Sequence, residues 1–209
     1  MSTLTQLVDN IAADLKDTGN VAWSADELKR AVRWALHELS WAAPRRGTAT
    51  IIARESTREY SLAAAGVTGL LFITEVWYPY DEEDPAYPPQ SVPWRLLDDD
   101  TLWLDVASVT GGETIRLFCA QPQTVSGLDG AAATTLSTEQ EELVCLGAAG
   151  YAALQRAQES IGRVNVSQQA PRLWREWGEQ RLRQFRERLA QLARREMQWR
   201  AAWTEGWKA

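Results

Sequence analysis

The feature that most constrains the fold is segment 171–203, which carries a single apolar stripe. Its apolar side chains recur at steps of three and four residues: Leu182, Phe185, Leu189, Leu192, Trp199 and Trp203. This spacing predicts one continuous amphipathic helix, with Glu196 as the one polar member of the stripe. At 1.5 Å per residue, the helix would be on the order of 50 Å long. That is longer than the core of such a chain needs, so we expect the helix to reach a partner.

A helical run rich in small residues, 141–154, precedes the long helix, and a break is expected between them near residues 161–170. Gly147 and Gly150 stand among alanines, so another helix can approach this run closely. We expect the long helix to pack against this small-residue face through about Leu192. Its later tryptophans would then contact a partner.

Two further helices are predicted before residue 44. The first covers residues 3–16, and Gly19 would supply the left-handed residue at its end. The second covers about residues 25–42 and begins with a capping box of Ser24 and Glu27.

This second helix has two apolar stripes, which predicts that it packs between two layers. Trp34, His37 and Trp41 form one of the stripes. We interpret Trp34 and Trp41 as core residues rather than exposed binding aromatics. His37 is interpreted as an ordinary helix histidine rather than a ligand or base, because no cluster of reactive residues surrounds it in the sequence.

From residue 47 the hydrophobic period changes to that of strands. Six short β-branched or aromatic runs are bounded by turn residues, at 48–53, 58–62, 70–78, 94–97, 101–105 and 113–119. The run Asp98–Asp100 would turn one hairpin, and Gly111–Gly112 another. The predicted fold class is α+β, mainly α: a helical bundle (1–46 and 124–209) with an inserted antiparallel β-module (47–123) and a long C-terminal helix.

The loop 79–93 is rich in proline and acidic residues, which excludes a central strand. It is either a solvated excursion without a role, or a contact loop or acidic pore lining. A calcium site at residues 81–84 is only weakly indicated, since the ligand spacing of an EF-hand is absent.

Composition excludes most catalytic and membrane classes. The chain has one histidine and two cysteines, Cys119 and Cys145, which we interpret as core residues; no zinc, nucleophile or phosphate-loop motif occurs. We therefore expect no enzyme, cofactor or metal. No apolar run reaches the roughly 18–20 residues of a membrane span, and no secretion signal is evident. We expect a soluble protein made in the cytosol.

Charge is unevenly distributed along the chain. The net charge of −6 divides into about +5 for residues 170–209 and −11 for the rest. An arginine-rich helix is compatible with nucleic-acid binding, the alternative function. Acidic residues are interspersed among these arginines, and arginine and tryptophan also dominate protein interfaces, so a protein interface is favoured. Five tryptophans support this interpretation: Trp174, Trp177, Trp199, Trp203 and Trp207.

The order of these parts resembles that of a known family. Helix 23–39 followed by Pro44, inserted short strands, helix 136–154 and a long charged terminal helix are together similar to the head-to-tail adaptor (connector) proteins of tailed bacteriophages. The resemblance is one of pattern over most of the chain, strongest in the first and third of these parts.

The resemblance implies a non-enzymatic homo-oligomeric ring, commonly of twelve copies, in the neck of the virion. The ring would dock on the portal protein, carry a tail or nozzle protein, and let DNA pass without sequence-specific binding. Carried onto this chain, it implies portal contacts by Arg194, Arg195, Trp199, Arg200, Trp203 and Trp207. Contacts with the channel or the tail would involve Asp81, Glu82, Glu83, Asp84 and Tyr87.

Overall fold

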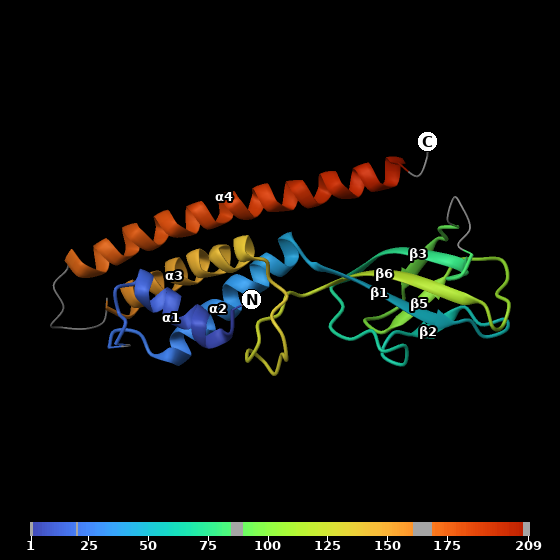
Figure 1. Cartoon of the computed structure of the whole chain (residues 1–209), viewed down its shortest axis with the longest axis horizontal. Helices are drawn as coiled ribbons and strands as arrows, with labels where there is room; N and C mark the ends of the chain where they lie inside the picture. Colours follow the sequence, from blue (N-terminus) through green and yellow to red (C-terminus); the bar gives the residue numbers. More distant parts are fainter. Residues whose placement is uncertain (1, 20, 85–89, 161–168, 207–209) are drawn as a thin grey trace. The chain divides into compact units, whose positions relative to one another are not determined.

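The structure, a computed structural model, describes residues 2–19, 21–84, 90–160 and 169–206; in the last helix it describes the side chains of residues 170–197. The chain divides into a helical unit, Met1–Ala43 with Gln123–Trp199, and a β unit, Pro44–Pro122 with Arg200–Ala209. The helices are α1 (Leu4–Asp14), α2 (Ala25–Ala42), α3 (Thr138–Ser160) and α4 (Gln169–Gly206) (Figure 1). The predicted α+β, mainly α fold with a long C-terminal helix is confirmed.

The first two helices begin at capping boxes. Thr3 caps α1 with Gln6, and Ser24 caps α2 with Glu27 as predicted. The predicted left-handed role of Gly19 is wrong, because Lys16 adopts the positive φ of 58° after α1. The carboxylate of Asp17 then accepts hydrogen bonds from the backbone N–H groups of Val21, Ala22 and Trp23, each 2.9 Å long. A side chain, and not a glycine, therefore organises this turn.

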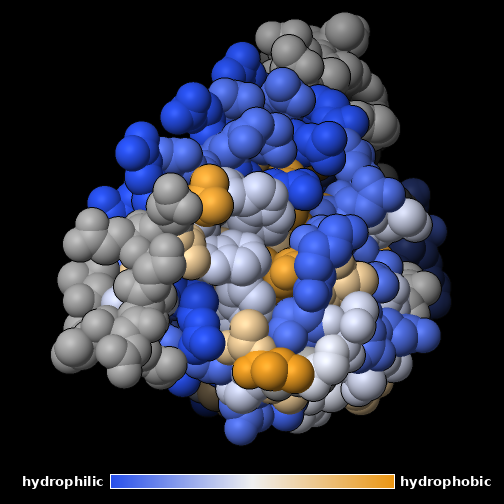
Figure 2. All heavy atoms as spheres, turned by 90° about the vertical axis from the view of Figure 1, so that its left-hand side faces the viewer, coloured by the Kyte–Doolittle hydropathy of each residue, from blue (hydrophilic) through white to orange (hydrophobic). Residues whose placement is uncertain are grey.

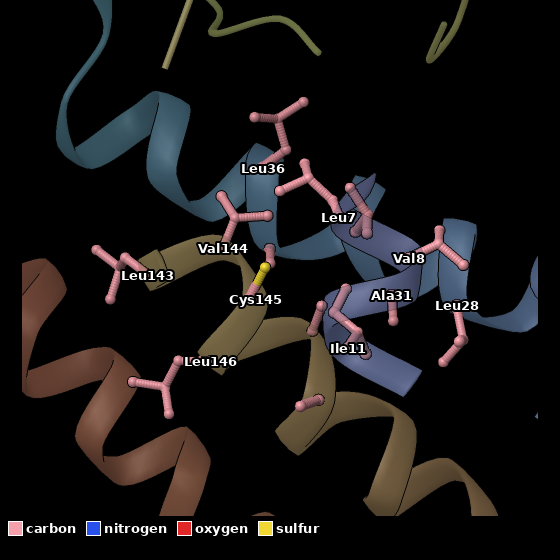
Figure 3. Close-up of a cluster of buried hydrophobic side chains, with 14 of the residues drawn as sticks. Leu7, Val8, Ile11, Leu28, Ala31, Leu36, Leu143, Val144, Cys145 and Leu146 are labelled. Atoms are coloured by element: carbon pink, nitrogen blue, oxygen red, sulfur yellow. The ribbon is translucent and has the colours of Figure 1, made fainter. Parts of the chain in front are cut away.

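The core of the helical unit lies between α1, α2 and α3. Figure 3 shows apolar side chains from the three helices pointing toward one another, Leu7 and Ile11 from α1, Leu28 from α2 and Val144 from α3 among them. These side chains are buried because each helix has apolar residues at helical spacing on one face. The middle of α3, residues 143–153, is buried except for the partly exposed Tyr151, consistent with its predicted central position.

The β unit has two three-stranded antiparallel sheets. One has the order β1 (Arg45–Ile52), β6 (Thr114–Gln121), β3 (Phe72–Tyr80); the other has the order β2 (Glu59–Ser61), β5 (Thr101–Leu104), β4 (Trp94–Leu96). Each strand coincides with one of the six predicted runs. Side chains from both sheets, such as Leu117 of β6 and Leu102 of β5, meet in one buried cluster. This shared core holds the sheets together, since each buries one face of alternating side chains.

One predicted hairpin is confirmed and the other is wrong. β4 and β5 pair around the Asp98–Asp100 turn, where the Asp98 carboxylate accepts hydrogen bonds from the Asp100 and Thr101 N–H groups. The Gly111–Gly112 turn does not join paired strands, because β5 and β6 belong to different sheets. The N–H of Gly112 instead donates to Ala53, just past the end of β1.

The chain leaves the helical unit after Ala43 and returns to it at Gln123. The side-chain amide of Gln123 donates a hydrogen bond to the backbone carbonyl of Ala43 at 2.9 Å. The backbone N–H of Gln123 donates to the Ser40 hydroxyl at 3.0 Å. The two points are therefore joined within the helical unit.

Candidate functional site

The long helix α4 crosses α3 at positions where both helices have glycine residues. A Cβ atom built on Gly147 would lie 2.8 Å from the Phe185 ring, and one on Gly178 would lie 2.9 Å from the carbonyl oxygen of Gly150. Real Cβ atoms do not approach so closely, so these glycines set the distance between the helices. The predicted packing of the long helix against the small-residue face of α3 is confirmed.

Aromatic side chains hold the first half of α4 against the helical core. Trp174 meets Trp23 edge to face, with ring centres 4.9 Å apart, and Trp177 meets Trp174 at 6.3 Å. The guanidinium of Arg181 lies 4.9 Å from the Trp177 ring centre. The interpretation of Trp174 and Trp177 as partner-binding residues is therefore corrected, because both are partly buried against their own core. The signal was available in the sequence, since Trp174 and Gly178 extend the stripe of Leu182 at steps of four.

The two tryptophans of α2 have different environments. Trp34 stacks on Tyr151 and lies 5.7 Å from the Phe185 ring, so its assignment to the core is correct. Trp41 is 53% exposed, which contradicts its predicted burial. Its indole N–H donates to the His37 ring at 3.3 Å, and His37 is also exposed. The second stripe of α2 thus packs at Trp34 and lies at the surface toward its C-terminal end.

Other apolar side chains of the helical unit also reach its surface. Val21 is 89% exposed and Leu173 is 65% exposed. Figure 2 shows an end of this unit where apolar and weakly polar side chains gather between hydrophilic ones. Such gathered apolar surface is typical of contact regions.

Leu192 is the last residue in the described part of α4 that belongs to the core of the helical unit. Met197 is 62% exposed, and Arg195 donates to Glu139 of α3 at 2.7 Å. Arg194 is exposed and forms no ion pair with any residue whose side chain the structure describes. The helix continues to Gly206. Of the remaining portal-contact candidates, Trp207 and the side chains of Trp199, Arg200 and Trp203 lie outside the described residues.

Together, α4 and α3 form a groove of about 670 Å³. Its apolar part includes Leu154 of α3 with Leu182 and Ala190 of α4. The polar lining consists of Glu179, Arg183, Arg186, Glu187, Gln191 and Arg194. We call this the arginine groove. Sequence reasoning noted these arginines but gave no sign that they gather beside Leu154.

The acidic loop begins in a defined turn after β3. The Asp81 carboxylate accepts hydrogen bonds from the Glu83 N–H at 2.9 Å and the Asp84 N–H at 3.3 Å. Glu82 lies 3.9 Å from the guanidinium of Arg116. The side chains of Glu83 and Asp84 are exposed. The fifth candidate of this loop, Tyr87, lies outside the described residues.

An aromatic cluster on the outer face of the first sheet was missed by sequence reasoning. The rings of Trp77 and Phe118 have centres 4.5 Å apart, and Tyr80 lies 6.0 Å from Trp77. Arg116 lies 5.4 Å from the Tyr80 ring centre, which ties the acidic turn to the cluster. The alternation of side chains along β6, where Leu117 faces the core and Phe118 faces outward, could have predicted an aromatic residue on this face.

The two cysteines are buried, and the described acidic and histidine side chains form no metal-ligand cluster. Cys119 and Cys145 are buried free thiols, and burial raises the pKa of Cys145 to about 12. Burial also raises the pKa of Cys119. Within residues 2–19, 21–84, 90–160 and 169–197, no three His, Cys, Asp or Glu side chains gather as a metal site would require.

The described residues present two charged surface features, the arginine groove and the acidic turn. No helix of the described chain is long and apolar enough to span a membrane. Comparison with known proteins finds no matching family model and no matching curated protein.

Proposed function

We propose that the protein is a structural virion component. It would form an oligomeric adaptor ring between the portal of a bacteriophage capsid and the tail, extending the DNA channel. The carrying observation is the length of α4. It continues from Leu192 to Gly206, a rise of about 21 Å at 1.5 Å per residue, after its last described core contact.

The fold supports this proposal through the resemblance in sequence. A helical bundle interrupted by a small β unit and completed by a long helix is what the resemblance to head-to-tail adaptors implies. The sequence from residue 199 onward adds Trp199, Trp203 and Trp207, and tryptophan is enriched among the residues that dominate binding energy. We assign these three residues to the portal contact.

The charge distribution fits a channel for DNA. Residues outside 170–209 carry a net charge of −11, and like charge discourages adhesion to phosphates. DNA could then move past such a surface without being held.

The portal assignment is tested by a chain that ends at Met197. This truncation keeps Leu192 and the Arg195–Glu139 pair, so we expect a folded protein. Binding to the portal protein of the same genome, measured by co-sedimentation and negative-stain microscopy, should be lost. The full-length variant with Trp199, Trp203 and Trp207 all changed to alanine should behave likewise, whereas Trp41→Ala should bind normally. Undiminished portal binding by the truncated chain would refute the assignment.

A second candidate function, nucleic-acid binding by α4, is favoured by its exposed arginines. Arg175, Arg183, Arg186 and Arg194 are exposed and form no ion pair among the described residues. If they bind phosphates, duplex DNA should bind with an affinity that falls steeply as salt rises. Absence of duplex binding at low salt would eliminate this candidate.

A further inference from the structure

The arginine groove has the chemistry of a receptor for carboxylates. Arg183, Arg186 and Arg194 line it, and none of them forms an ion pair with a described residue. By contrast, Arg172 is paired with Glu176 and Arg195 with Glu139. A guanidinium group can bind a carboxylate through two parallel hydrogen bonds, which makes a carboxylate the natural ligand of these side chains.

The groove also has an apolar part at the helix crossing. Leu182, only 5% exposed, packs beside Gly150, and Leu154 lies next to Gly178. The groove therefore combines apolar contact with three arginines, whose positive charge exceeds the negative charge of the two lining glutamates, Glu179 and Glu187. Its volume of about 670 Å³ is enough for a few side chains of a projecting turn.

The acidic turn is a matching ligand within the same sequence. The Asp81 carboxylate accepts hydrogen bonds within the turn, and Glu82 lies near the guanidinium of Arg116. Glu83 and Asp84 are exposed and have no partner among the described residues. The turn is therefore shaped by its own hydrogen bonds and leaves two carboxylates available. The unit that carries it, residues 44–122, has a net charge of −6.

The other acidic turn is less suitable. Asp98 accepts hydrogen bonds from two backbone N–H groups, and Asp100 accepts them from the Ser61 hydroxyl and the Ala63 N–H. Only Asp99 is left without such a bond among the described residues. Of the two turns, the one at residues 81–84 therefore offers the larger free negative charge.

We infer that the arginine groove of one copy binds the acidic turn, Glu83 and Asp84, of a second copy. The groove and the turn are different surfaces of one chain, so the contact is head-to-tail and continues from copy to copy until it closes. This inference rests on the proposed ring and names the contact that holds neighbouring copies together. Opposite charges on the two surfaces would also orient the copies before they touch.

The test uses charge reversal in the full-length protein. We expect Arg183→Glu with Arg186→Glu, and separately Glu83→Arg with Asp84→Arg, to weaken self-association about tenfold or more in Kd. Association is measured by sedimentation velocity over a range of protein concentrations. A chain carrying all four changes should regain association, because the charges are exchanged between the two surfaces. Melting temperatures of all variants establish that each is folded.

Matched controls lie on the same elements. Arg175→Glu reverses an exposed arginine of α4 outside the groove lining, and Asp99→Arg reverses an acid in the other turn. Both should leave self-association unchanged. Association of the unaltered chain should also weaken as salt rises.

Three results would overturn the inference: a chain that stays monomeric at every concentration, reversals without effect, or reversals that abolish duplex DNA binding instead of self-association. Portal binding is measured separately on the same variants. Self-association that follows the charges while portal binding is absent would support the groove contact and refute the adaptor function. If the variants still bind the portal and their self-association does not depend on these charges, the adaptor function would be supported and the groove contact refuted.

Discussion

The indole of Trp34 stacks on the ring of Tyr151, with centres 4.8 Å apart and planes 12° from parallel. This contact joins α2 to α3, and Phe185 of α4 lies against the same indole. Three helices thus share one aromatic contact.

We expect Trp34→Ala to lower the free energy of unfolding by about 3 kcal/mol, the low end for removal of a buried aromatic side chain. Trp41→Ala, in the same helix but 53% exposed, should change it by about 0.5 kcal/mol or less. Urea titrations followed by circular dichroism would measure both. Equal losses for the two variants would contradict the assignment of Trp34 to the core.

The close approach of α3 and α4 makes a second prediction. Gly147→Ala should destabilise the protein by about 1–2 kcal/mol, because the new methyl group collides with Phe185 while alanine favours the helix. Combining it with Phe185→Leu should cost less than the sum of the two single changes. A strictly additive double variant would show that the ring does not limit the approach.

Asp17 predicts a dependence of stability on pH. The hydrogen bond from the Trp23 N–H, with those from Val21 and Ala22, holds the pKa of the Asp17 carboxyl below its usual value of 3.8. A lowered pKa in the folded state means that the stabilisation is present above the usual pKa and is lost as the pH falls through the folded value. Asp17→Asn should therefore be destabilising near neutral pH and nearly neutral under strongly acidic conditions.

Urea unfolding midpoints measured near neutral pH and in strong acid would give the loss of stability caused by Asp17→Asn under each condition. Asp9→Asn, on the exposed face of α1, is the control. A destabilisation by Asp17→Asn that is equally large in acid would contradict a role for the charged carboxylate.

The two thiols should be inert in the folded protein. Because burial raises the pKa of Cys145 to about 12 and also raises that of Cys119, little thiolate exists near neutral pH. A colorimetric thiol reagent should detect neither cysteine in native protein and both in concentrated urea. Rapid native labelling would show that α3 or β6 opens more readily than its burial implies.

Local patterns predicted the elements of this fold well. Each of the six strands lies at a predicted run, and the long helix was expected from the stripe of Leu182, Phe185 and Leu192. These patterns work because burial of one face imposes a period on the sequence. The partition of strands into two sheets was not predictable, since pairing depends on partners distant in the chain.

The candidate site was less accessible to sequence reasoning. Residue type alone does not separate Trp174, which packs on Trp23, from Trp41, which is exposed. Only the continuation of the helical stripe through Gly178 distinguishes them. The groove depends on Leu154 of α3 lying beside the arginines of α4, a tertiary relationship without a local signal.

The junction at Ala43 and Gln123 has an evolutionary consequence. Since the chain departs and returns at points joined by hydrogen bonds, the segment between them leaves the helical unit and re-enters it at one place. Such a segment can be lengthened, shortened or exchanged while the helical scaffold is kept. Sequences on the two sides of this junction can then diverge at different rates.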